Sequence, residues 1–461
     1  MDIEISVTIT APDGTAHTDK IGAFSKDIEA AGDIGLSIEE GKAVLLGIQQ
    51  KVVAAQCEAF CIERARCTCC DRKLRGKGWR QIRYRTVFGD IAIESPRFYS
   101  CQCHNSQAKT FSPLNELLPD HIAPELLWLE TKWASLVSFG VTSDLLKDVL
   151  PIDVKLNPDT IRRHLGRVAT RMEAELADER YSFIETSVHQ RAELPNPEGQ
   201  ITVGIDGGYV RSRDPGQSHF EVTVGKSIPT DRPSRYLGLV QSHDDKPKRR
   251  LHEVLKDQGW QENQPVTFMT DGGDTVINMA RFMAPASEHI LDWFHITMRI
   301  TVMQQCVKGL AHHNEDDAEK LARLLRQIKG FLWNGNLHDG HAAIEDLVID
   351  LEDVETDYAS FKALRKAASE FATYITNNAS MIPNYAERRR YGERVSTGFV
   401  ESTVNTVVGK RFGKRQQMRW SKRGAHLMLQ TRTRVLDGTL RTKFEQWYPA
   451  LKSSSETGMA A

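Results

Sequence analysis

The sequence has no apolar run that approaches the roughly 20 residues needed to span a bilayer. Its first residues contain no basic segment followed by an apolar one, so we expect no secretory signal. Both absences predict a cytoplasmic protein without a membrane partner. Net charge is also nearly absent, at −1, so the total charge gives no argument for a nucleic-acid partner.

Cysteine is scarce, and the eight cysteines are unevenly distributed. Seven of them lie between Cys57 and Cys103, and Cys306 stands alone. In a chain without a secretory signal, this clustering favours metal binding over disulfide bonds. Cys57 and Cys61 are four residues apart on a predicted helix, where we interpret them as ordinary small apolar residues.

Four of the clustered cysteines have the spacing of a zinc ribbon. Cys67-x-x-Cys70 and Cys101-x-Cys103 lie about thirty residues apart, on either side of two alternating runs that predict a β-hairpin. Each pair would sit on a short turn, and the hairpin would bring the two turns together. The sequence therefore predicts a Zn²⁺ site formed by these four residues, with His104 as an alternative to Cys103.

A helical region follows the hairpin. Residues 128–170 have apolar positions at helical spacing, and their pattern resembles a helix-turn-helix. Arg162, Arg163 and Arg167 lie near the start of the last helix, where a recognition helix would contact the major groove of DNA. Helical hairpins are common, so a purely structural role is the alternative.

The pattern then changes to that of an α/β domain. After a linker at 193–199, three strand-like runs are followed by a helical stretch, a buried strand, a short helix and a last strand. This order, β-β-β-α-β-α-β, extends to about residue 295. Residues from 296 to about 380 have only helical patterns, and residues 397–436 are helical and basic.

Two of the predicted strands end in the same tripeptide, Asp-Gly-Gly, at Asp206 and at Asp271. Carboxylates at the carboxyl ends of strands lie where open α/β sheets carry their sites. The glycines would allow a polyanionic ligand to approach closely. Asp-Gly is also a common turn dipeptide, so a turn is the alternative for either residue alone. Together the pair predicts a site for Mg²⁺ or Mn²⁺, which prefer oxygen ligands.

Two carboxylates alone hold two divalent ions poorly, so a third acid is expected. Glu387, Glu393 and Glu401 are all candidates on the residues alone. Glu401 lies near the start of a predicted helix that would run directly into a basic block. Within this block we interpret Trp420 as a core residue, with stacking on an exposed base as the alternative. Seven basic residues form the block and would bind DNA phosphates: Lys410, Arg411, Lys414, Arg415, Arg419, Lys422 and Arg423.

Five segments together resemble a known family. They are VGIDGGYV, TDGGDT, ILDWFHITMRI, STGFVEST and QQMRWSKRGAHLMLQTRTR. These segments resemble the core blocks of bacterial insertion-sequence transposases of the ISKra type, which are similar to Mutator-like transposases. The resemblance covers nearly the whole chain. It implies a DNA transposase in which Asp206, Asp271 and Glu401 form the catalytic triad. The gap of 130 residues between the last two fits the helical domain that this family inserts before its glutamate helix.

The resemblance also implies an architecture. We expect an α/β, RNase H-like (retroviral-integrase-type) core with an all-helical insertion, preceded by zinc-ribbon and helix-turn-helix regions. Asp292 and His295 match an acid-x-x-histidine element that is associated with organising DNA in related transposases; a buried strand-end histidine is the alternative. Seven segments are expected: a helical region (1–66), a metal-binding hairpin (67–115, turning at Gly89-Asp90), a DNA-binding helical region (116–192), the first part of the core (200–295), the insertion (296–385), the C-terminal core helices (386–440) and a tail (441–461).

The implied partner is double-stranded DNA, both the terminal inverted repeats of the element and its target. We expect a homodimer or a higher oligomer on this DNA, associated with the nucleoid. Two other functions stay open: a nuclease on the same fold that cuts without strand transfer, and a DNA-binding protein derived from a transposase. Hydrolysis and strand transfer use the same metals and differ in whether water or a 3′-hydroxyl attacks. The intact Asp-Asp-Glu set argues against the third possibility.

Overall fold

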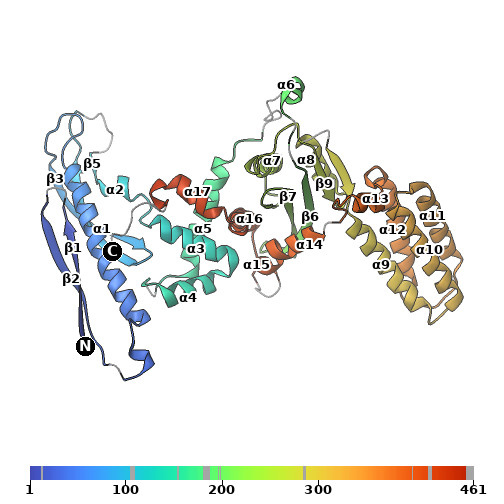
Figure 1. Ribbon diagram of the computed structural model, residues 1–461, viewed down its shortest axis with the longest axis horizontal. Helices are drawn as coiled ribbons and strands as arrows, with labels where there is room; N and C mark the ends of the chain where they lie inside the picture. The colour runs from blue at the N-terminus through green and yellow to red at the C-terminus, as the bar shows by residue number, and fades with distance from the viewer. Residues whose placement is uncertain are drawn as a thin grey trace. The chain divides into compact units, whose positions relative to one another are not determined.

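A computed structural model gives the fold of the protein (Figure 1). The chain divides into two compact units, Met1–Ala169 with Gly438–Ala461 and Thr170–Asp437. Helices and strands are mixed, as predicted, and no described helix is long and apolar enough to cross a membrane. For a few residues within helices the structure describes the backbone but not the side chain; these are residues 32, 188, 274–276, 400 and 401. The structure describes residues 1–11, 14–27, 29–103, 109–152, 155–179, 187–195, 197, 199–283, 287–396, 398–413 and 418–452.

The first unit opens with a β-hairpin where we expected a helical region. β1 (Asp2–Thr10) and β2 (Ala16–Ser25) pair antiparallel. The expectation of helix throughout residues 1–66 is therefore wrong for residues 2–25. The segment IEISVTIT alternates apolar and polar residues, which is the period of a half-buried strand and could have revealed the hairpin.

A long helix follows the hairpin. After the short η1 (Ala31–Asp33), α1 (Ile38–Glu63) begins at a capping box. The Ser37 hydroxyl accepts a hydrogen bond from the Glu40 N–H, and the Glu40 carboxylate accepts one from the Ser37 N–H. One face of α1 packs on the next hairpin, so burial stabilises the helix in addition to its cap.

The hairpin predicted between the cysteine pairs is confirmed, but its turn lies two residues earlier than expected. β3 (Gly76–Thr86) pairs antiparallel with β4 (Gly89–Tyr99). We expected the turn at Gly89-Asp90, whereas the loop consists of Val87-Phe88. Gly89 instead begins β4 with a φ of +112°, which a residue with a side chain rarely adopts.

Short elements complete the first unit. The C-terminal α17 packs on α3, where the Arg441 guanidinium donates to both carboxylate oxygens of Glu125 at 2.6 and 3.0 Å. The helix predicted from Pro158 is present as α5, which continues into the second unit. The elements are β5 (Thr110–Phe111), α2 (Leu114–Leu117), α3 (Pro124–Leu136), α4 (Phe139–Val149), α5 (Pro158–Glu175), α17 (Leu440–Trp447) and η5 (Pro449–Leu451).

The second unit is built on a five-stranded sheet with the order β10-β9-β6-β7-β8. The central β6 is antiparallel to β7 and parallel to β9. Apart from α6, the elements follow the predicted order β-β-β-α-β-α-β along the chain. Their bounds are α6 (Val188–Glu193), β6 (Ile201–Arg211), β7 (His219–Pro229), β8 (Arg235–Leu239), α7 (Pro247–Asp257), β9 (Val266–Thr270), α8 (Asp274–Met283) and β10 (Glu288–Leu291).

The residues of β6 alternate between two differently covered faces of the sheet. Val203 and Ile205 belong to a hydrophobic cluster that includes α7 and α8. Gly208 faces the other side, where an added Cβ atom would lie 3.2 Å from Val404 Cγ1. Because successive strand residues point to opposite faces, Asp206 is on the same side as Gly208.

A helical bundle follows β10, as the sequence predicted for residues 296–385 (Figure 1). One hydrophobic cluster joins the bundle to Met269 and Leu291 of the sheet, so the two share a core. Tyr385 is fully buried there, and its hydroxyl donates to the Leu291 carbonyl oxygen at 2.7 Å. The elements are α9 (Trp293–Leu310), α10 (Glu315–Trp333), α11 (Leu337–Asp353), α12 (Phe361–Asn377), η2 (Ala379–Met381) and α13 (Tyr385–Arg390).

The last segment of the unit contains a π-helical turn, a feature that often marks functional sites. The buried Arg432 guanidinium satisfies carbonyl oxygens of this turn. Its Nε donates to the Val407 oxygen at 2.7 Å, and its Nη2 donates to the Thr406 oxygen at 2.5 Å. The elements are α14 (Gly398–Val404), the π-helical η3 (Asn405–Gly409), α15 (Lys410–Phe412) and α16 (Lys422–Leu436).

Candidate functional site

Asp206 and Asp271 lie on adjacent parallel strands at the same level of the sheet. β6 and β9 pair in register as far as Gly204 and Met269. Asp206 is two residues beyond Gly204, and Asp271 is two residues beyond Met269, so the two acids follow the last paired residues by the same number of positions. Asp271 directly follows the carboxyl end of β9, where open α/β sheets carry their sites. Asp206 lies within β6, which continues to Arg211, so the expectation that this strand ends at Asp206 is wrong. The topology thus brings the two acids together.

The Asp271 turn is held by residues of the helical bundle. Gly272 has a φ of +93°, and an added Cβ atom would collide with the Asn378 side chain. The Tyr374 hydroxyl donates to the Asp271 carbonyl oxygen at 3.1 Å, and burial raises the pKa of Tyr374, so the hydroxyl stays protonated. The Asp271 carboxylate accepts from the Gly273 N–H at 3.0 Å and is otherwise exposed. No local sequence signal connects α12 to this turn.

The helix that carries Glu401 packs on the Asp206 side of the sheet. Gly208 has no side chain, and Val404 at the end of α14 approaches it closely. Position 401 precedes Val404 by three residues, so both positions lie on one side of the helix. The Glu401 side chain itself lies outside the described part of the structure. Of the two other candidate acids, Glu393 is bonded to the Arg388 guanidinium at 2.6 Å.

Asp292 and His295 border the same edge of the sheet. Asp292 is fully buried and caps α9, because its carboxylate accepts from the Phe294 N–H at 2.9 Å. His295 Nε2 lies 3.6 Å from Asp292 Oδ2 and 3.9 Å from Asp206 Oδ1. Its side chain is 23% exposed, so the imidazole can reach a ligand that is bound near Asp206.

The expected basic block does not form one continuous helix. α15 ends at Phe412, because the backbone of Gly413 is extended with a ψ of 175°, and α16 begins only at Lys422. Arg411 is fully buried, which corrects its assignment as a DNA-binding residue. Its guanidinium lies 5.1 Å from the centre of the Trp420 ring, and burial lowers its pKa to about 9.

The rest of the block differs in exposure. Trp420 is a buried core residue, as predicted. Lys410, Arg419 and Arg423 are exposed and Lys422 is half-buried. Lys414 and Arg415 lie outside the described residues.

One exposed member of the block lies near the end of the strand that carries Asp206. The Trp420 N–H donates to the Arg211 carbonyl oxygen at 2.9 Å, and the Arg213 N–H donates to the Trp420 carbonyl oxygen at 2.8 Å. Arg419 precedes Trp420, so three exposed arginines meet where β6 ends. The sequence reading included Arg419 and missed Arg211 and Arg213, because the pairing of these distant segments has no local signal.

The four predicted cysteines form one cluster in the first unit. The Sγ atoms of Cys67, Cys70, Cys101 and Cys103 all lie within 4.8 Å of one another. Cys67 Sγ is 3.2 Å from Cys103 Sγ, and Cys70 Sγ is 3.5 Å from Cys101 Sγ. A tetrahedral zinc ion with bonds of about 2.3 Å would separate its sulfur ligands by about 3.8 Å. The cluster includes Cys103, and the alternative His104 lies outside the described residues.

Backbone amides favour the thiolate form of two of these four cysteines, whereas the neighbouring thiols raise the pKa of Cys70 and of Cys103. The N–H groups of Cys69 and Cys70 donate to Cys67 Sγ and lower the pKa of that thiol to about 6. The Cys103 N–H lowers the pKa of Cys101 in the same way. Thiolate is the form that binds metals. Cys57, in contrast, is buried in a hydrophobic cluster, which raises its pKa and agrees with an ordinary apolar role.

The arginines assigned to a recognition helix lie on the outer side of α5. Its inner side buries His164, whose Nδ1 lies 2.5 Å from the buried Glu130 carboxylate. Arg162 and Arg167 are ion-paired with Asp159 at 3.0 Å and Asp120 at 2.7 Å. Arg163 Nη2 donates to Thr160 Oγ1 at 3.2 Å. All three are exposed, and DNA phosphates would compete with these surface contacts.

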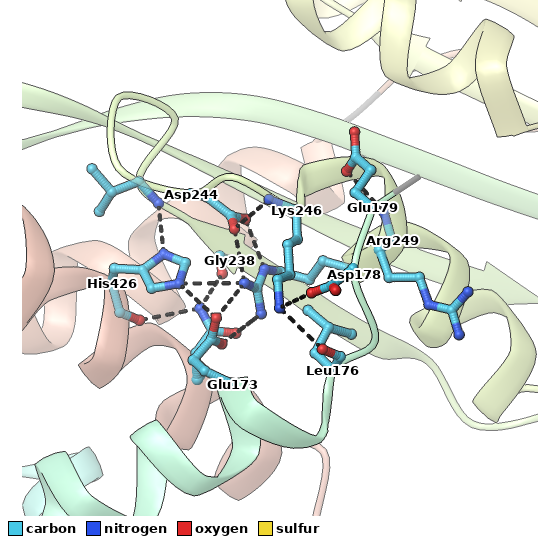
Figure 2. A network of polar contacts seen from close by, with 12 residues as sticks. Glu173, Leu176, Asp178, Glu179, Gly238, Asp244, Lys246, Arg249 and His426 are labelled. Atoms are coloured by element: carbon cyan, nitrogen blue, oxygen red, sulfur yellow. Dashed lines mark hydrogen bonds and ion pairs between the residues drawn. The ribbon is translucent and has the colours of Figure 1, made fainter. Parts of the chain in front are cut away.

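Figure 2 shows a polar network that the sequence reading missed. The Arg250 guanidinium on α7 donates to the Glu173 carboxylate at 2.8 Å, to Asp244 at 2.9 and 3.0 Å, and to Gln430 at 2.7 Å. His426 Nδ1 accepts from a backbone N–H, so Nε2 carries the proton and donates to Glu173 at 3.3 Å. The network joins α5, α7 and α16.

This network is a structural ion-pair cluster rather than a metal site. The ligand atoms of Glu173, Asp244 and His426 lie close enough together to hold a metal ion. The Arg250 guanidinium already contributes a positive charge at this position and bonds to both carboxylates. Removing a single partner from such a buried network leaves an uncompensated charge.

The network predicts an acid-sensitive contribution to stability. Burial alone would raise the pKa of Glu173, but hydrogen bonds from His426 and Arg250 lower it to about 2 from the usual 4.5. The stabilisation is therefore present above about pH 4.5 and is lost as the pH falls toward 2. We expect Glu173→Gln to lower the unfolding free energy at pH 7 by about 3 kcal/mol and to flatten its dependence on pH below 4.5.

Denaturant unfolding of both proteins between pH 7 and 3 would measure this effect. Glu175→Gln, two residues further along α5, is the matched control, because Glu175 forms a partly exposed i,i+4 ion pair with Arg171. We expect that control to cost no more than about 0.5 kcal/mol. Equal losses in the two variants would contradict the assignment.

No protein-family model matches this chain, and a search of curated proteins finds no relative.

Proposed function

We propose that the protein is a DNA transposase of the Asp-Asp-Glu type, with an RNase H-like core and Asp206, Asp271 and Glu401 as catalytic residues. The observation that carries the proposal is the pairing of β6 with β9, which supports adjacent carboxylates at one sheet edge. The element order and the central position of β6 are in keeping with an RNase H-like sheet. The approach of α14 to Gly208 supports Glu401 as the third acid.

The residues of the site fit divalent ions such as Mg²⁺ or Mn²⁺. Carboxylate oxygens are the ligands that these ions prefer, and Asp271 is exposed. Protein side chains, not open space, lie against Gly208 and Gly272. Such ions, when bound, would activate the attacking hydroxyl and stabilise the leaving oxygen. Asp206, Asp271 and Glu401 would hold the metal ions. His295 would contact the backbone of the bound DNA. Arg211, Arg213 and Arg419 would hold the DNA strand through its phosphates.

Two further parts of the proposal concern the first unit. The cysteine cluster would hold a structural Zn²⁺, for which four thiolates are a typical closed ligand set. Helices α3, α4 and α5 would form a helix-turn-helix-like module whose Arg162, Arg163 and Arg167 contact DNA. Exposure of these arginines on one side of α5 supports this assignment.

A cleavage assay tests the proposed function. The purified chain would be incubated with labelled duplexes from the regions that flank its own coding sequence, together with an unlabelled target duplex. With Mg²⁺ or Mn²⁺ we expect cleavage at one position and a larger strand-transfer product. With Ca²⁺ we expect binding without cleavage, because Ca²⁺ tolerates looser coordination geometry than Mg²⁺.

The products distinguish the alternatives. Cleavage without joined product would support an RNase H-like nuclease that does not transfer strands. A bound complex that is never cut in any metal would support a DNA-binding protein derived from a transposase. Either result would overturn the proposed transposase activity.

A further inference from the structure

The β3–β4 hairpin carries several positive charges at the end that lies close to the cysteine cluster. The proposed function gives these charges no role. We define the hairpin basic surface by its exposed members: Arg72, Lys73, Arg75, Lys77, Arg80 and Arg97. Asp71 is the single acid from Cys70 to Arg80, and its carboxylate is bonded to Arg66 at 3.1 Å. The turn end of the hairpin is different, because Arg83 is ion-paired with Asp90 there and Glu94 lies opposite Gln81.

The cations of this surface are not neutralised within the described part of the chain. None of Arg72, Lys73, Arg75, Lys77 and Arg80 forms an ion pair there. Two of them share one aromatic ring: the Arg75 guanidinium and the Lys77 ammonium lie 5.5 and 5.8 Å from the centre of Tyr99. An anion bound beside Tyr99 would therefore interact favourably with both cations.

We propose that the hairpin basic surface binds the phosphate backbone of duplex DNA. The sheet is antiparallel here, with β5 paired to Phe98 and Tyr99 of β4, and its exposed cations complement the regularly spaced phosphates of DNA. Single-stranded DNA would also use aromatic stacking, for which the exposed Trp79 on β3 is available, so the test below compares the two forms of DNA.

The surface is built together with the cysteine cluster. The Tyr99 N–H donates to the Arg75 carbonyl oxygen, and the Cys67 N–H donates to the Arg72 carbonyl oxygen, both at 2.9 Å. Tyr99 lies two residues before Cys101. A metal ion in the cluster would therefore fix the positions of the cations, and its removal should weaken binding through this surface.

The test is DNA binding by the full chain in which Arg72, Lys73, Arg75 and Lys77 are all changed to Gln. Fluorescence anisotropy with a random duplex of about 20 base pairs would be recorded between about 50 and 200 mM salt. We expect the affinity to fall at least about tenfold and the slope of log affinity against log salt to flatten by about 3. The control removes the same charge from α10 and α12 of the helical bundle through changes to Gln at Arg326, Lys329, Lys362 and Lys366.

The outcomes separate this proposal from the catalytic one. Binding is measured without Mg²⁺ and with Asp206 and Asp271 intact, so an absence of cleavage would not bear on it. Retained metal content and an unchanged circular-dichroism spectrum show that the variant is folded. An unchanged affinity and slope, a loss equal to that of the control, or a loss confined to single-stranded DNA would each overturn the proposal.

Discussion

Changing Asp271 to alanine is expected to lower the rate of Mg²⁺-dependent DNA cleavage by about 10³-fold or more, as removal of a preorganised electrostatic contact does in other enzymes. DNA affinity should change little, because the exposed arginines and lysines that contact phosphates are retained. The measurement combines single-turnover cleavage in Mg²⁺ with binding in Ca²⁺ on the same duplex. Cleavage at the wild-type rate would rule out the paired-acid site.

Glu221→Gln is the matched control for this variant. Glu221 lies on β7 opposite Tyr209, and its carboxylate lies over Gly207. Gly207 and Asp206 point to opposite faces of the sheet. Glu221→Gln therefore removes an acid that is close to Asp206 in the sheet but lies on the opposite face. We expect its cleavage rate to stay within about twofold of the wild type. Equal losses in both variants would indicate a disturbed sheet instead of lost metal ligands.

The second large effect concerns the cysteine cluster. Cys67→Ser combined with Cys70→Ser is expected to abolish the binding of about one zinc ion per chain, because two of four ligands are lost. Zinc in small structural sites contributes on the order of 10 kcal/mol to folding. The segment around β3 and β4 should then unfold locally, which hydrogen exchange would detect as lost protection. Metal content would be measured by elemental analysis of the purified chain.

Cys69→Ser provides the control in the same turn. Cys69 is exposed and does not belong to the group of four thiols. We expect this variant to retain its zinc and its protection from exchange. Wild-type protein without zinc, or equal metal loss in Cys69→Ser, would contradict the four-cysteine site.

The sequence was sufficient for features that depend on local pattern. Hydrophobic periodicity predicted the five strands of the sheet and the helical bundle, since burial on one side imposes a period that is visible in the residues. The paired Asp-Gly-Gly tripeptides singled out Asp206 and Asp271. The spacing of the cysteine pairs predicted a cluster that the structure assembles. The N-terminal hairpin has the same kind of signal, in the alternation of IEISVTIT, although the sequence analysis predicted a helical region there.

Only the tertiary structure decided which side chains face solvent and which distant segments meet. Arg411 belongs to a basic run by sequence, yet the fold buries it against Trp420, because the helix ends at Phe412 and the chain returns beside β6. The Arg250 network draws its partners from four separate segments, and Tyr374 reaches the Asp271 turn from α12. Such contacts have no local signature, because they depend on the pairing of strands and helices that are far apart in the chain, whereas periodicity and motif spacing depend on neighbours alone.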